Sequence, residues 1–216
     1  MIEWAKAIER RNPLHPDQKR WDRKYKAMKF LQGKKPNAFL KKHLHFLPRG
    51  NALDLACGDG TNAVFLAEQG FRVEAVDISP VGLRMARRRA REKAVKVRFR
   101  QADLNSFPLR PNFYDLITVF YFLNRRLIPR IKRALKEGGM IVYETYTNQQ
   151  AKLGTGGPIR ASYLLKPHEL RNRFSEFHIL IYREGIFLID GRRCAIASLI
   201  AKKPKTDGKK PAKELR

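Results

Sequence analysis

The fold is decided by the stretch Asn51-Ala52-Leu53-Asp54-Leu55-Ala56-Cys57-Gly58-Asp59-Gly60-Thr61-Asn62. Its apolar run is typical of a buried strand, two glycines form a turn after it, and Thr61-Asn62 opens a helical segment. A strand, a glycine turn and a helix in this order form the first half of a nucleotide-binding βα unit. An ordinary turn between packed elements has the same local pattern, so the acidic residues downstream have to decide between the two interpretations.

Length and composition favour one α/β domain. The chain has 216 residues, 43% of them hydrophobic and 31% charged, which suffices for a sizeable core. No apolar run approaches the roughly 18 residues of a membrane span, and the first thirty residues lack the apolar centre of a signal peptide. We therefore expect a cytoplasmic protein without membrane contact. Cys57 and Cys194 lie in apolar runs and predict neither a disulfide framework nor a metal site.

The net charge of +26, with an isoelectric point near 10.6, is the most unusual bulk property of the chain. Such a charge indicates an anionic partner, of which nucleic acid is the obvious candidate. A solvated basic surface that serves solubility has the same composition, and charge alone leaves both interpretations open.

Periodicity and turn residues predict an alternating order of strands and helices. Strict alternation of apolar and basic residues over Val95–Arg100 predicts an edge strand, and Asp190-Gly191 predicts a hairpin turn. Ser79 and Pro80 are suited to begin a helix. The other expected helices cover 36–47 and 128–136, with a short one near 166, and the other expected strands cover 71–77, 114–121, 140–145, 177–182 and 194–201. We expect a helical lid over 1–32, a main domain over 33–202, a mobile loop over 147–162 and a disordered basic tail over 203–216.

Three acids fall at the ends of successive predicted strands. Asp54 lies within the first strand, Asp77 ends the second, and Asp103 follows the third. Ligands of open α/β sheets bind outside the carboxyl ends of the strands, where an Asp can accept hydrogen bonds from both ribose hydroxyls of a nucleoside. Asp77 follows Gly60 by 17 residues, near the spacing expected of such an acid. Asp103 could instead cap the turn that it begins.

The combination of motifs resembles the class I S-adenosylmethionine (SAM)-dependent methyltransferases. Residues 53–60 resemble the first motif of that family, and Val76-Asp77-Ile78-Ser79 resembles the second. Gln101-Ala102-Asp103-Leu104 resembles the motif on the adenine side. Residues 113–117 resemble the fourth strand, and residues 135–139 the turn before the fifth strand. It implies a doubly wound, Rossmann-like sheet of seven mostly parallel strands in the order 3-2-1-4-5-7-6, with helices on both faces and a C-terminal antiparallel hairpin.

Within that family the chain is most similar to the small single-domain branch that includes the tellurite-resistance methyltransferases. Trp21-Asp22-Arg23-Lys24-Tyr25 resembles their aromatic N-terminal segment, and Lys166-Pro167-His168-Glu169-Leu170 their late helix start. Two departures matter: Ala56 stands where the first motif usually has glycine, and the His-Arg pair before the last strand is absent, which puts methylation of chalcogen oxyanions in doubt.

The resemblance implies SAM as cofactor, S-adenosylhomocysteine as product and an in-line transfer of the methyl group to a nucleophile. The residues that it places at the cofactor are Trp21, Tyr25, Asp54, Ala56, Cys57, Gly58, Gly60, Asn62, Asp77, Ile78, Asp103, Leu104 and Phe120. Backbone near the glycine turn would hold the methionine part, Asp77 the ribose, and Asp103 with Leu104 the adenine.

The acceptor side is less clear from the sequence. Tyr121, Glu144 and His168 are the polar groups that strand-end logic places near an acceptor, and each could equally be a packed or solvated residue. A soft acceptor such as a thiolate needs no general base. We expect a small-molecule acceptor and a monomer or homodimer without a metal ion.

Three alternatives remain. The basic surface could dock RNA or a protein for methylation, or the chain could be a non-catalytic nucleic-acid-binding protein with this fold. A dinucleotide oxidoreductase would use a similar turn, but 57–62 lacks the third glycine of GxGxxG.

Overall fold

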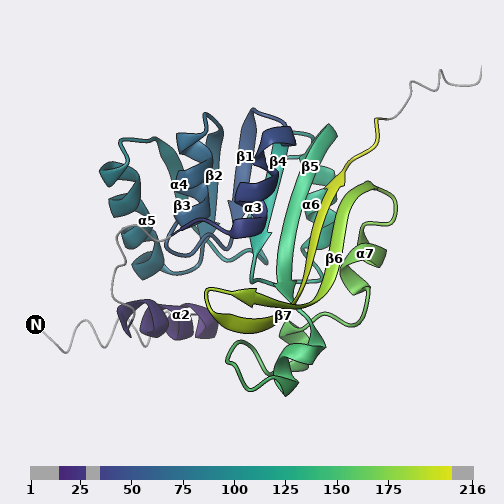
Figure 1. Cartoon of the computed structure of the whole chain (residues 1–216). Helices are drawn as coiled ribbons and strands as arrows, with labels where there is room; N and C mark the ends of the chain where they lie inside the picture. Colours follow the sequence, from purple (N-terminus) through teal and green to yellow (C-terminus); the bar gives the residue numbers. More distant parts are fainter. Residues whose placement is uncertain (1–14, 28–34, 206–216) are drawn as a thin grey trace, which may run out of the picture.

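Strand β1 (Asn51–Leu55) lies inside the sheet, between two neighbouring strands, and four of its five residues are buried. The computed structural model describes residues 15–27 and 35–205 of the chain. Seven strands form one sheet in the order β3-β2-β1-β4-β5-β7-β6, with helices on both faces (Figure 1). The predicted sheet order and the terminal antiparallel hairpin are therefore confirmed. The remaining strands are β2 (Arg72–Asp77), β3 (Val97–Gln101), β4 (Tyr114–Phe120), β5 (Leu135–Tyr146), β6 (His178–Ile189) and β7 (Arg192–Lys202).

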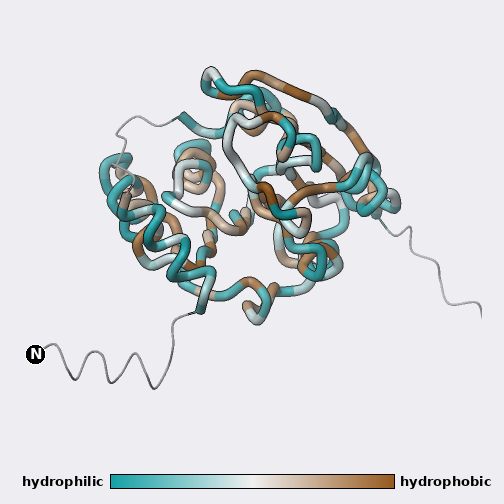
Figure 2. The backbone as a smooth tube through the Cα atoms, turned by 90° about the horizontal axis from the view of Figure 1, so that it is seen from below, coloured by the Kyte–Doolittle hydropathy of each residue, from teal (hydrophilic) through white to brown (hydrophobic). Residues whose placement is uncertain are grey.

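The helices follow the strands in the predicted alternation. They are α2 (Pro16–Ala27), α3 (Ala38–His43), α4 (Thr61–Glu68), α5 (Pro80–Glu92), α6 (Ile128–Ala134) and α7 (Glu169–Arg173). Ser79 caps α5 as predicted, because its hydroxyl accepts a hydrogen bond from Gly82 N at 3.0 Å and Pro80 occupies the first turn. In Figure 2, which views the molecule from below, hydrophilic and hydrophobic residues alternate along the helical turns, as expected for helices with one face on the sheet.

Parallel pairing brings the functional strand ends to one edge. Strands β1 to β5 pair in parallel, so their carboxyl ends meet at the lower edge of the sheet in Figure 1. Helix α2 lies below the left part of this edge, and the far end of the β6–β7 hairpin curves beneath the sheet towards it. The hairpin turns at Asp190 and Gly191, whose φ angles of 47° and 75° are those of the turn predicted there.

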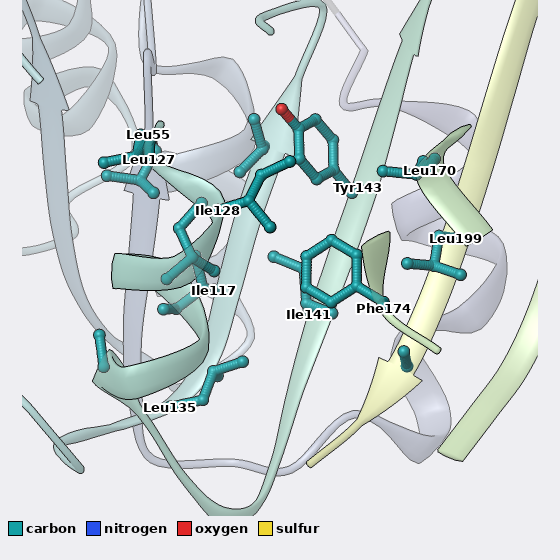
Figure 3. Packing of buried hydrophobic residues seen from close by; sticks show 14 of the residues in the cluster. Leu55, Ile117, Leu127, Ile128, Leu135, Ile141, Tyr143, Leu170, Phe174 and Leu199 are labelled. Carbon is teal, nitrogen blue, oxygen red and sulfur yellow. The ribbon is translucent and has the colours of Figure 1, made fainter. Parts of the chain in front are cut away.

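Two hydrophobic cores cover the two faces of the sheet. On one face, Ile128 of α6, Leu170 of α7 and Phe174, which follows α7, belong to one core with Ile141 and Tyr143 of β5 (Figure 3). On the other face α3 and α4 pack on β1, β2 and β4. Full burial of one such side chain stabilises the fold by about 1.5–3 kcal/mol. These two layers hold the sheet rigid and so hold its carboxyl edge in place.

Some boundaries differ from the sequence prediction. The helix expected over 36–47 is α3 followed by a 3₁₀ turn, η1 (Leu44–Phe46), because Asn37 is the N-cap and its side chain accepts a hydrogen bond from Leu40 N at 3.1 Å. Helix α6 ends at Ala134, since Leu135 is already extended and pairs with Tyr114 of β4. The expected loop over 147–162 contains the 3₁₀ turn η2 (Asn148–Lys152), and η3 (Ala161–Tyr163) closes it.

The predicted domain limits remain predictions. Residues 1–14 and 28–32 of the expected lid segment and 206–216 of the expected basic tail lie outside the described residues. Within the described ranges, no helix has the length and apolar character that crossing a membrane requires.

Candidate functional site

The glycine turn brings three residues into left-handed backbone conformation. Ala56, Gly58 and Gly60 have φ angles of 55°, 56° and 74°. A Cβ on Gly60 would lie 2.5 Å from the Cβ of Ala86, so glycine is required where α5 packs on the turn. Ala56 has the same backbone angle without being glycine, which costs about 1–2 kcal/mol for an L residue. This explains in physical terms why glycine suits the position that Ala56 occupies.

Asp77 joins the turn to the start of α5. Its Oδ2 accepts a hydrogen bond from Gly58 N and its Oδ1 from Ser79 N, both at 2.8 Å. Burial raises the pKa of the carboxyl, and these backbone N–H groups limit the rise. The Ile78 N–H acts on the carboxylate in the same direction. Because an ionised carboxylate can accept about four hydrogen bonds, acceptor capacity remains for a ribose hydroxyl, while the group at the end of β2 also holds the turn in shape.

Asp54 and Asp59 complete a buried acidic cluster beneath the turn. Asp54 is 2% exposed and accepts the hydroxyl of Thr118 at 2.7 Å. Burial, with smaller contributions from Asp77 and Asp59, raises the pKa of Asp54 to about 7. Asp59 forms a buried ion pair with Arg89 of α5 at 3.3 Å. Sequence analysis missed this pair; the signal was an arginine on the apolar face of an otherwise amphipathic helix.

Helix α2 lies against the glycine turn. Trp21 and Tyr25 stack with ring centroids 5.9 Å apart. A Cβ on Gly58 would lie 2.4 Å from the Tyr25 hydroxyl oxygen, and a Cβ on Gly82 3.0 Å from its ring. The ring therefore packs between the turn and α5, where burial, with Asp77 next, raises the pKa of the phenol. Helix α2 therefore lies at the carboxyl edge of the sheet, and its role as a lid stays a prediction.

Asp22, which sequence analysis did not single out, anchors that helix. Its Oδ1 accepts the hydroxyl of Ser79 at 2.5 Å and faces Val81 N at 3.4 Å. A carboxylate at the N-terminus of α5 is favoured by the helix dipole. An Asp one residue after Trp21 offered no signal on its own, because its partner lies 57 residues away.

Asp103 caps its own turn, as the alternative interpretation held. Its Oδ1 accepts the backbone N–H and the side-chain amide of Asn105, both at 2.9 Å. Its Oδ2 lies 3.7 Å from His15 Nε2, at the start of α2. Leu104 beside it is buried. Asp103 thus keeps acceptor capacity at the same edge as Asp77.

The other predicted cofactor residues surround the same edge. Cys57 N donates to Val76 O at 3.0 Å, and Asn62 Oδ1 accepts Asn37 N at 2.8 Å. Phe120 is buried at the end of β4, and Ile78 is half-buried after β2.

Two of the three candidate acceptor-side groups meet in one buried network. Glu144 is 1% exposed, and each of its oxygens accepts two hydrogen bonds. Oε1 accepts from Asn37 at 2.7 Å and Tyr121 at 3.1 Å, and Oε2 from Ser198 at 2.7 Å and Arg183 at 3.2 Å. Tyr121 is 37% exposed, yet its hydroxyl lies against Glu144, and burial together with that carboxylate raises the pKa of its phenol.

His168 lies apart from this network. It is exposed before α7, where its backbone N–H donates to Glu184 of β6 and its backbone carbonyl accepts the N–H of Asn172 at 3.0 Å. No group of three or more His, Cys, Asp or Glu side chains within 15–27 and 35–205 could hold a metal ion.

Known proteins share this sequence pattern and fold. Residues 52–139 match the family model described as a methyltransferase domain. "Hemagglutinin 1" of Eikenella corrodens is 30% identical over 166 residues, 70% of this chain and 54% of that protein. "Probable S-adenosyl-L-methionine-dependent methyltransferase TehB" of Haemophilus influenzae is 26% identical over 141 residues, 62% of this chain and 48% of that protein. The chain thus spans about half the length of these curated relatives.

The solved structure of TehB from Haemophilus influenzae has the same fold. Its TM-score is 0.66 at 19% identity, covering 86% of this chain and 66% of that one. The sheet order and the match over residues 52–139 are those of class I SAM-dependent methyltransferase domains, a class whose cofactor is SAM. Among them, the sequence and the fold are similar to those of TehB.

Proposed function

We propose that the protein transfers the methyl group of SAM to a small-molecule acceptor and releases S-adenosylhomocysteine. The observation that carries the proposal is the Asp77 carboxylate. It joins the glycine turn to α5 at the carboxyl edge of the sheet and retains acceptor positions that suit a ribose. The family match and the relatives' names support methyl transfer as the reaction.

The chain's own residues would bind and orient the reactants. SAM brings an activated sulfonium methyl, so no residue has to activate the donor. Backbone from Ala56 to Gly60 would hold the methionine part, Asp77 the ribose, and Asp103 with Leu104 the adenine. Trp21 and Tyr25 would cover the site and exclude water. Alignment of donor and acceptor can lower the activation barrier by roughly 7–11 kcal/mol.

The network around Glu144 indicates what kind of acceptor suits the site. A carboxylate that already accepts four hydrogen bonds, one of them from Arg183, has no free position for a substrate proton. The raised pKa of Tyr121 keeps its phenol protonated at neutral pH, so it can donate a hydrogen bond but cannot serve as a base. These groups favour an acceptor that reaches the site already nucleophilic, such as a thiolate.

Methyl-labelled SAM tests the proposal against a panel of small thiols, amines, alcohols, metalloid oxyanions and RNA. We expect labelled thioethers from thiols, at a rate that rises with pH as the fraction of thiolate grows. Label found in RNA alone would contradict the small-molecule proposal, and no label in any acceptor would contradict methyl transfer. Asp77→Asn serves as the variant that should lose product with every acceptor.

A further inference from the structure

A cleft lies at the opposite edge of the sheet from the cofactor residues. It has a volume of about 700 Å³, within the usual range for ligand sites. Its walls are the amino ends of β1, β2, β3 and β4 together with the C-terminal half of α5. Because the strands are parallel, these ends lie one strand length away from the glycine turn. The cleft is therefore separate from the site described above.

Positive charge dominates its lining. Six cationic side chains line it, and Glu74 is its one acid; the cations are Arg72, Arg87, Arg91, Lys96, Arg98 and Arg110. Glu74 is already compensated, since it accepts Arg110 at 3.0 Å and lies 3.4 Å from Arg100.

Four of these cations have no carboxylate partner in the described part of the chain. Arg87 and Arg91 are one turn apart on α5, and both are exposed. Lys96 and Arg98 alternate along the start of the edge strand and are exposed as well. Within residues 15–27 and 35–205, no carboxylate oxygen lies within 4.0 Å of any of the four. One row of unpaired cations on α5 and another on the edge strand thus flank the cleft. This arrangement favours binding of an extended anion.

Aromatic rings lie between the cations. Phe99 and Phe113 line the cleft and are half-buried, and the Arg110 guanidinium lies 3.5 Å from the centroid of the Phe113 ring. Bases of a single strand stack on such rings with about 1–3 kcal/mol each. Arginine pairs with phosphate through two parallel hydrogen bonds, which suits a sugar–phosphate backbone.

We propose that this cleft, lined by Arg87, Arg91, Lys96, Arg98 and the rings of Phe99 and Phe113, docks single-stranded RNA. The docking is independent of methyl transfer. An anionic membrane is the less suitable partner, because surface binding needs apolar side chains that insert beside the cations. The exposed large hydrophobic residues of the described ranges are Tyr121, Ile159, Leu180, Ile186 and Leu188, and none of them lines the cleft.

Fluorescence anisotropy with a labelled single-stranded RNA of mixed sequence, at 50 to 200 mM salt, tests the proposal. The test variant combines Arg87→Gln, Arg91→Gln and Arg98→Gln. A control variant loses the same charge at exposed positions outside the cleft, through Lys152→Gln, Arg160→Gln and Arg171→Gln. Calorimetry with SAM checks that both variants keep the fold and the cofactor site.

We expect the test variant to bind RNA at least tenfold more weakly at 100 mM salt. The slope of log affinity against log salt should fall by about 2, since each lost phosphate contact with a single strand contributes roughly 0.7. The control variant should stay within twofold of the wild type. Equal losses in both variants would refute the cleft as the docking site. Tighter binding to vesicles of anionic lipid, or to a DNA strand of matching sequence, would refute RNA as its partner.

Discussion

The substitution Asp54→Asn should stabilise the protein by an amount that depends on pH. Asp54 is buried beneath the glycine turn, where its carboxyl accepts the hydroxyl of Thr118. Burial raises its pKa from 3.8 to about 7. An asparagine amide has nearly the same shape and can accept the same hydroxyl. Its NH2 group cannot accept the Ala63 N–H, which adds a cost, but the amide carries no charge to bury, and only the charge makes the difference depend on pH.

The sign and the magnitude follow from the raised pKa. The folded protein holds the Asp54 proton up to about pH 7, whereas the unfolded chain releases it near pH 3.8. The wild type is therefore most stable, in this respect, below pH 3.8, and it loses stability as the pH rises towards 7. Each pH unit in this window corresponds to about 1.4 kcal/mol. Between pH 5 and pH 8 the wild type should lose about 3 kcal/mol that the variant keeps.

Urea unfolding of both proteins at pH 5 and pH 8 measures the difference. The stability gain from Asp54→Asn should be about 3 kcal/mol larger at pH 8 than at pH 5. Asp190→Asn is the matched control, because Asp190 is exposed in the hairpin turn at a φ of 47°, which asparagine also adopts. If the gain in stability from Asp54→Asn is the same at both pH values, the claim that burial raises the pKa of Asp54 is refuted.

Three further substitutions test single contacts. Ala56→Gly should raise the free energy of unfolding by about 0.5–1 kcal/mol, because relief of the left-handed backbone exceeds the entropic cost of glycine; a loss in urea unfolding would contradict that strain. Asp59→Ala should cost about 3–5 kcal/mol because the buried Arg89 guanidinium loses the carboxylate with which it forms an ion pair, and a melting temperature within 2 °C of the wild type would show that the pair is dispensable. Asp22→Ala should speed the release of SAM in stopped-flow fluorescence, since α2 loses its bond to Ser79; an unchanged release rate would mean that α2 does not retain the cofactor.

Much of the fold could be predicted because its signals are local. The alternation over Val95–Arg100 predicted the edge strand, Asp190-Gly191 the hairpin, and Ser79-Pro80 the start of α5. The position of Asp77 at the carboxyl edge followed from the strand that precedes it and from the parallel order of the sheet.

The contacts that complete the site could not be predicted in the same way. Asp22 meets Ser79, Asp59 meets Arg89, and Glu144 meets Arg183 across 30 or more residues of sequence. No local pattern specifies which helix face or strand end comes opposite another. Sequence reasoning therefore named Glu144 as a candidate near the acceptor but not the four donors that occupy its oxygens.

The cytoplasmic location, the oligomeric state and the roles of Tyr121 and His168 stay predictions.

The most direct test of the account is a calorimetric titration of the folded protein with SAM, in wild-type form and as Asp77→Asn. We predict one site with micromolar affinity in the wild type. The variant should bind at least tenfold more weakly, because an amide cannot accept hydrogen bonds at both of its ends. Circular dichroism would confirm that the variant is folded, since Asp77 also holds Gly58 and Ser79. Absence of SAM binding by the wild type at millimolar concentration, or equal affinity in the two proteins, would contradict the central claim.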